Sequence, residues 1–257
     1  MEGMPFDLTI WTLVFLRASA MLTIFPLFSL QNFPVQLRVA LGAMVAFLVS
    51  PMLTPPVLTQ AGFFSVLGML VMEVLCGLLL GFVSRLVFHI LEFAGNLISS
   101  ELGLNMASTL NPFTRNRSDI PGTVLYYLGA LLFLVLDLHH ALLLAFQKAY
   151  AFLPVGGVHL QQALFSNIVG STGQIFTLGL LMAAPVIAVS FLVNLVFSVL
   201  GRAVPQMNVF SESFSFRILA GLMVFGLSIN LMAQHISNYL RRLPDDFLRV
   251  AQLLGNA

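Results

Sequence analysis

The chain has 257 residues, of which 59% are hydrophobic and only 8% are charged, and its formal net charge is +1. Soluble domains carry about 25% charged residues, so this composition excludes a soluble globule of this size. It indicates an integral membrane protein or a component buried among other apolar chains. The sequence has no dense run of Lys or Arg, which argues against nucleic-acid binding.

Six apolar segments are candidates for membrane-crossing helices, which need about 20 residues to span the hydrocarbon core. In chain order they cover residues 8–30, 38–58, 62–91, 122–146, 172–200 and 214–240. None of them alternates with the period of two expected for strands of a membrane barrel. The sequence therefore predicts an all-α integral membrane fold, with the helices arranged as hairpins inside a larger assembly.

The third segment contains two glycines, Gly77 and Gly81, with GxxxG spacing. Small residues four positions apart lie on one face of a helix and let a second helix approach closely in a membrane. We therefore expect another helix to pack against Gly77 and Gly81.

A polar stripe follows the end of the same segment. Its members recur at spacings that place them on one helical face: Arg85, His89, Glu92, Asn96 and Ser99. The pattern predicts that the third helix continues past its apolar part. A polar face at membrane depth must meet other polar groups or water, so the stripe either joins an intramolecular network or faces an aqueous path.

The stretch at residues 97–121 interrupts the apolar pattern. It is rich in polar and turn-forming residues, but it keeps three large apolar ones, Met106, Leu110 and Phe113. A loop that faces solvent has little use for such side chains. We therefore expect this stretch to pack against protein or to fill a cavity. Such a stretch would act as a closing element of the protein.

The fourth segment carries the most reactive group of side chains, Asp137, His139 and His140. Asp137 and His140 would be neighbours on a helix. The group fits either a proton relay or a structural role, near a helix end or as the partner of Arg17 or Arg85. His139 and His140 would point about 100° apart on a helix, so we predict no metal site. The chain lacks common catalytic and cofactor-binding motifs, so no catalytic residue and no cofactor are predicted.

The stretch between the fifth and sixth segments, residues 201–217, is expected to be a hairpin tip, because Pro205 and Asn208 favour a tight turn there. The residues of the tip also match the pattern of a known family. The matching residues are Arg202, the run Pro205, Gln206, Met207, Asn208, Val209 and Phe210, and then Gly221 and Leu222. In these residues the chain resembles the FliR/SctT family of type III export gate components.

Further matches to this family are spread over nearly the whole chain. They are Arg17 with Pro26, Arg38 with Ala40 and Leu41, Glu101-Leu102-Gly103 with Asn111-Pro112, and Phe152-Leu153-Pro154. Residues 211–215, reading SESFS, depart from the family, which is more apolar there. This departure bears on the contacts expected at the hairpin tip more than on membership of the family.

The resemblance implies a subunit of a helical, pseudo-symmetric export gate in the bacterial inner membrane, at the flagellar basal body. FliP-like and FliQ-like subunits and an FlhB-like subunit would be its partners, with unfolded export substrates as the cargo. Residues 1–170 would take a FliP-like role, and residues 171–257 would form a FliQ-like hairpin. The loop at 105–119 would plug the closed pore, with Met106, Leu110 and Phe113 as the sealing side chains.

Two other functions are compatible with parts of the sequence. A proton-coupled small-solute transporter would use Asp137, His140, Glu73 and Arg85, although no inverted repeat supports it. An intramembrane enzyme would depend on the Asp-His group alone. The resemblance also leaves open a virulence secretion system in place of a flagellar one.

Overall fold

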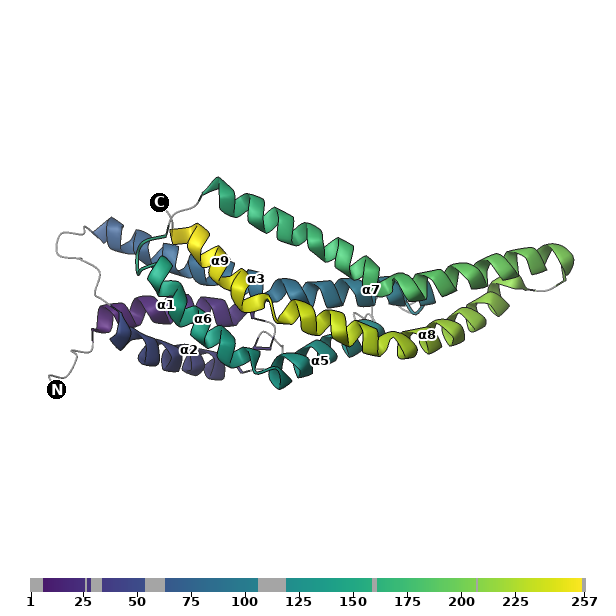
Figure 1. The fold of residues 1–257 in the computed structure, drawn as a ribbon, viewed down its shortest axis with the longest axis horizontal. Coiled ribbons are helices and arrows are strands. Elements are labelled where there is room, and N and C mark those ends of the chain that lie inside the picture. The colour runs from purple at the N-terminus through teal and green to yellow at the C-terminus, as the bar shows by residue number, and fades with distance from the viewer. Residues whose placement is uncertain are drawn as a thin grey trace. The chain divides into compact units, whose positions relative to one another are not determined.

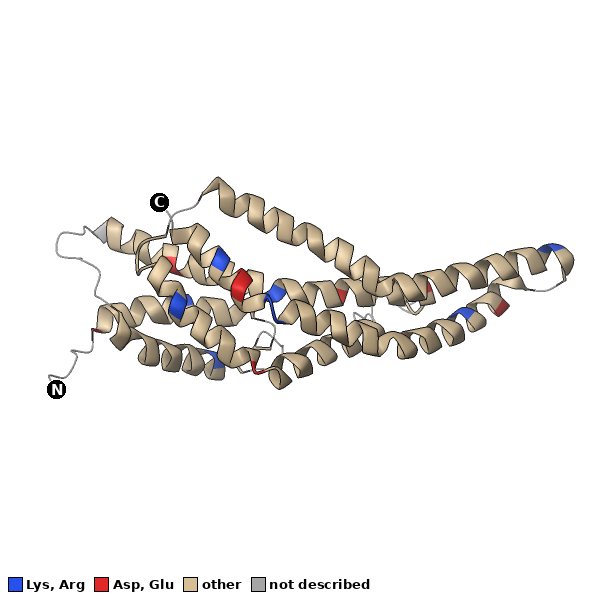
Figure 2. Ribbon diagram, in the orientation of Figure 1, with Lys and Arg blue, Asp and Glu red and all other residues tan. Residues whose placement is uncertain are grey.

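The computed structural model describes residues 7–25, 27–28, 34–53, 63–105, 119–158, 161–206 and 208–255. Within these ranges the chain is helical and contains no strand, which confirms the predicted all-α class (Figure 1). The elements are α1 (Leu8–Ile24), α2 (Val35–Val49), the 3₁₀ turn η1 (Ser50–Met52), α3 (Phe63–Leu102), α5 (Ile120–Val135), α6 (Leu138–Phe152), α7 (Gln162–Ala203), α8 (Val209–Leu240) and α9 (Leu243–Gly255). Charged residues are sparse along these helices (Figure 2).

The six expected segments correspond to α1, α2, α3, the pair α5 and α6, α7, and α8. Among the described residues, four helices are long and apolar enough to cross a membrane, or five if α5 and α6 count as one broken span. The helix α1 is apolar but has only 17 residues. α3 runs without a break for 40 residues to Leu102, so the prediction that the third helix continues past its apolar part is confirmed.

The fourth expected segment is not one continuous helix. It breaks between Val135 and Leu138, and α5 and α6 are bent by 70° at this point. Asp137 takes the left-handed conformation at the break, with φ 54°, and precedes the first residue of α6. A left-handed residue ends the helical path of the backbone, which accounts for the change of direction.

The chain divides into two compact units. The first contains Met1–Leu86, Leu136–Ser171 and Arg241–Ala257, and the second contains Val87–Val135 and Thr172–Leu240. In the first unit α1 packs on α2, and α6 packs on α9. In the second unit α5 packs on α8.

The helix α9 lies beyond the last of the six expected segments, which ends at residue 240. It is amphipathic and buries one face within the first unit: Leu243, Phe247, Val250, Ala251 and Leu254. These positions follow the spacing of an apolar stripe on a helix. At its end, a Cβ on Gly255 would collide with the carbonyl oxygen of Phe152, so the last turn of α9 lies directly against the end of α6.

Candidate functional site

A buried ion pair joins α1 to α3 in the first unit. Arg17 donates two hydrogen bonds to Glu73, from Nε to Oε2 at 2.6 Å and from Nη2 to Oε1 at 2.9 Å. Both side chains are 0% exposed. A two-pronged arginine–carboxylate contact is the strong, geometrically specific form of such a pair. Arg17 and Glu73 are 56 residues apart in the sequence, and no local pattern predicts that they meet.

Backbone groups and an aromatic ring complete the surroundings of this pair. Arg17 Nη1 donates to the carbonyl oxygen of Leu153 at 3.1 Å, and the Gly156 N–H donates to Glu73 Oε1 at 2.8 Å. The guanidinium carbon of Arg17 lies 4.3 Å from the ring centroid of Tyr150. Each of these groups presents the polarity opposite to the charge it faces, as a buried charge requires.

The two GxxxG glycines lie where α1 approaches α3. A Cβ on Gly77 would collide with the carbonyl oxygen of Arg17, and one on Gly81 would lie 2.7 Å from the carbonyl oxygen of Met21. Only glycine leaves room for backbone to pass this close. The same contact brings Arg17 within reach of Glu73, one helical turn before Gly77.

The polar stripe on α3 divides into several local contacts. His89 Nδ1 lies 3.0 Å from Glu92 Oε2, and Asn96 donates to the backbone oxygen of Glu92 at 2.8 Å. Ser99 is buried and donates from Oγ to Asp119 Oδ1 at 2.5 Å. Arg85 Nε is buried and has no hydrogen-bond partner among the described residues. Part of the stripe is thus bonded within the protein, while His89 and Glu92 stay partly exposed.

The expected plug residues Met106, Leu110 and Phe113 lie outside the described residues. So do Pro26, Asn111, Pro112 and Met207 of the family resemblance.

The two ends of this central stretch are held together in the second unit. The Ser99–Asp119 hydrogen bond links the end of α3 to the start of α5, and Asp119 Oδ1 also accepts the Gly122 N–H at 2.9 Å. A Cβ on Gly95 would collide with the backbone of Gly122, so the two helices touch here. Gly103, with φ 75°, ends α3 in the left-handed conformation that favours glycine.

The group of Asp137, His139 and His140 lies at the break between α5 and α6. The side chains of Asp137 and His140 are 78% and 70% exposed, and Asp137 Oδ1 is 3.8 Å from His140 Nδ1. The interpretation as a group near a helix end is confirmed, whereas a pairing of Asp137 with Arg17 is wrong, because Glu73 holds that arginine. The ring centroids of His139 and His140 lie 4.1 Å apart. The two rings are therefore closer together than we expected from side chains that point about 100° apart on a helix.

The hairpin tip between α7 and α8 is exposed at Arg202, Pro205, Gln206 and Asn208. Asn208 Oδ1 accepts the Ser211 N–H at 3.3 Å and so caps the start of α8.

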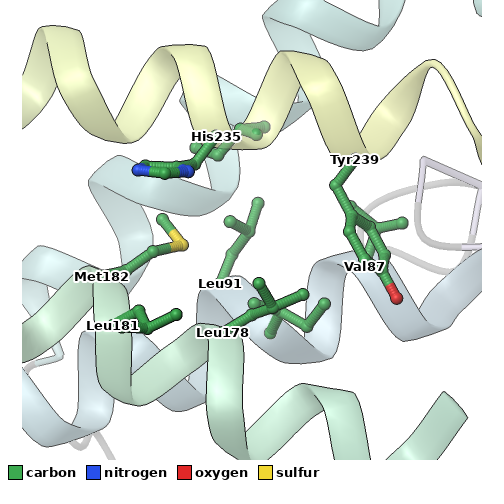
Figure 3. Close-up of a pocket in the computed structure, with 9 residues that line it drawn as sticks. Val87, Leu91, Leu178, Leu181, Met182, His235 and Tyr239 are labelled. Carbon is green, nitrogen blue, oxygen red and sulfur yellow. The ribbon is translucent and has the colours of Figure 1, made fainter.

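A small cavity of about 50 Å³ lies in the second unit between α3, α7 and α8 (Figure 3). His235 and Tyr239 of α8 lie across it from Leu178 and Met182 of α7. Its volume has room for a few waters, far less than the ~300 Å³ or more of small-molecule sites. This cavity therefore does not supply a ligand site.

Comparison with known proteins gives a consistent family. A sequence model of the family "Bacterial export proteins, family 1" matches residues 8–243. The flagellar biosynthetic protein FliR of Caulobacter vibrioides is 30% identical over 245 residues, which cover 94% of this chain and 97% of that protein. FliR of Escherichia coli K12 is 26% identical, with coverages of 96% and 95%, and FliR of Bacillus subtilis is 26% identical, with 95% of both chains covered.

Proposed function

Because the chain belongs to bacterial export proteins family 1, with the flagellar FliR proteins, we propose that it forms part of the pore of the flagellar type III export gate. Membership of this family makes it a membrane-embedded component of flagellar protein export. The finer proposal is that unfolded export substrates pass along a pore to which this chain contributes, across the bacterial inner membrane at the flagellar basal body. The observation that carries it is the family match, which runs through both compact units.

We further propose that the chain works only in an assembly with FliP-like and FliQ-like subunits and an FlhB-like subunit. Residues 1–170 take the FliP-like role and residues 171–257 the FliQ-like one. The hairpin helices support this, because large apolar side chains on both are more than half exposed: Phe176, Leu181, Val199, Phe210, Leu219 and Leu227. Apolar surface of this extent needs lipid or another protein to cover it.

Assembly is the property to test first. The detergent-extracted chain should migrate as a discrete large complex only when it is co-expressed with FliP-like and FliQ-like subunits. Native mass measurement of the chain alone, of the partners alone and of the three together supplies the comparison. A stable monomer or homodimer that does not bind these subunits would contradict the proposal and favour a transporter.

The transporter alternative has less support from the geometry. Of the residues it would use, Glu73 is buried against Arg17 and accepts a third hydrogen bond from Gly156. Asp137 is largely exposed at a helix break. We propose a pore component that performs no catalysis and needs no cofactor.

Within this pore, we propose that the loop at 105–119 closes the path when no substrate passes, with Met106, Leu110 and Phe113 as the sealing side chains. The Ser99–Asp119 hydrogen bond and the contact of Gly95 with Gly122 support it, because they hold both ends of the loop at one place. Apolar side chains in a constriction exclude hydrated ions by dewetting.

Deletion of residues 106–117 is expected to leave the complex assembled but to make cells leak ions, because the apolar seal is lost. Membrane conductance and survival in raised salt measure the leak. A matched variant keeps the loop length and replaces Met106, Leu110 and Phe113 with serine, and it should leak as well. Unchanged conductance in both strains would contradict the plug, while the assembly measurement would still stand.

A further inference from the structure

The turn that follows α6 contacts both members of the buried ion pair through its backbone. Its carbonyl group at Leu153 faces the Arg17 guanidinium, and its N–H group at Gly156 faces the Glu73 carboxylate. Each backbone dipole thus meets the opposite charge, and the two charges have a fixed order along the turn. The contacts bridge large sequence separations, 136 residues for Arg17 and 83 for Glu73.

We propose that Arg17 and Glu73 form a directional binding site for the backbone of residues 153–157, which fixes the end of α6 against α1 and α3. This role goes beyond charge balance, and it does not depend on the proposed pore function. The site is specific for the direction of the backbone, because the Arg17 cation faces a C=O group and the Glu73 anion faces an N–H group.

The shape of the turn suits such a site. Gly156 has φ 79°, a left-handed conformation that favours glycine and aims its N–H at Glu73. The Gly157 N–H donates to the Pro154 oxygen at 3.0 Å, which closes the turn on itself. Leu153 is fully buried. The Leu153 carbonyl therefore depends on Arg17 for its hydrogen bond, whereas the Gly156 N–H is partly buried and is bonded to Glu73.

Arg17 is matched to three partners at once. Nε and Nη2 bind Glu73, Nη1 binds the Leu153 oxygen, and the face of the guanidinium lies over the Tyr150 ring. A planar fork can serve all of these in one orientation, whereas a lysine ammonium is a single point charge on a flexible stem. The pair therefore selects one position for the turn.

Exchanging the two charges tests whether their order along the turn matters, because the attraction between the two side chains is kept. The double variant Arg17→Glu with Glu73→Arg keeps an ion pair, but the new carboxylate faces the Leu153 carbonyl and the new guanidinium faces the Gly156 N–H. Hydrogen exchange should then show the Gly156 amide exchanging at least about 10-fold faster than in the unmodified chain. Amides in the middle of α3 should keep their protection.

A second double variant removes both charges while keeping similar volumes, Arg17→Met with Glu73→Leu. Replacement of a buried ion pair by apolar residues of similar volume is often neutral or stabilising. We expect this variant to accumulate and to keep the α1–α3 packing, but to lose protection of the Gly156 amide by a similar factor.

Native protection of residues 153–157 in either double variant would overturn the proposal. Failure of the apolar variant to accumulate would overturn it too, because the helix packing itself would then depend on the charges. Neither outcome bears on assembly with partner subunits, which the native mass measurement tests separately.

Discussion

Replacement of Glu73 with alanine is expected to lower the free energy of unfolding by about 3–5 kcal/mol. The change leaves the Arg17 guanidinium buried without its counter-ion. It also removes the acceptor of the partly buried Gly156 N–H. For a chain of this size the loss corresponds to an apparent melting temperature lower by about 10 °C, measurable by heating the purified protein in detergent and following the remaining folded fraction.

The matched control is Glu212→Ala, which removes a carboxylate from the exposed first turn of α8. Its effect should be far smaller, because the Glu212 side chain is exposed and forms no ion pair with any of the described residues. If both variants lowered the free energy of unfolding equally, the burial of Glu73 would not explain the effect of Glu73→Ala. The apolar double variant at positions 17 and 73 should recover much of the stability that Glu73→Ala loses.

Gly77→Leu is expected to destabilise the first unit by about 3 kcal/mol or more, the upper end of the usual range for overpacking. Even a Cβ at this position would collide with the backbone oxygen of Arg17. Backbone cannot rotate away as a flexible side chain can, so α1 and α3 must move apart. That movement also separates Arg17 from Glu73, and both folded yield and recovery of the complex with partner subunits should fall.

Gly68→Leu is the control for this substitution, since Gly68 lies on the same helix and a Cβ there meets nothing within 4 Å. Both variants make the same chemical change in α3, so only the contact with α1 differs. Normal recovery of the complex with Gly77→Leu would contradict the packing role of this glycine.

Much of the architecture follows from local sequence patterns. Apolar runs of membrane length predict the helices and the class, because lipid leaves the backbone no partner except its own helix. The stripe from Arg85 to Ser99 predicts the length of α3, because a period near 3.6 is a property of one helix. α9 carries a similar signal in Leu243, Phe247, Val250 and Leu254, although it lies beyond the last expected segment.

The break at Asp137 had no such signal, since neither proline nor glycine occurs from position 130 to 153. The partner of Arg17 was equally hidden: Glu73 lies 56 residues away, and Asp137 is also a carboxylate in an apolar segment. Local patterns place a residue on a face of its own helix, but they do not say which helix meets that face. The α1–α3 contact through Gly77 and Gly81 selects Glu73, and the turn at 153–157 then completes the site, because a buried charge is stable only where every neighbouring polar group has a matching partner.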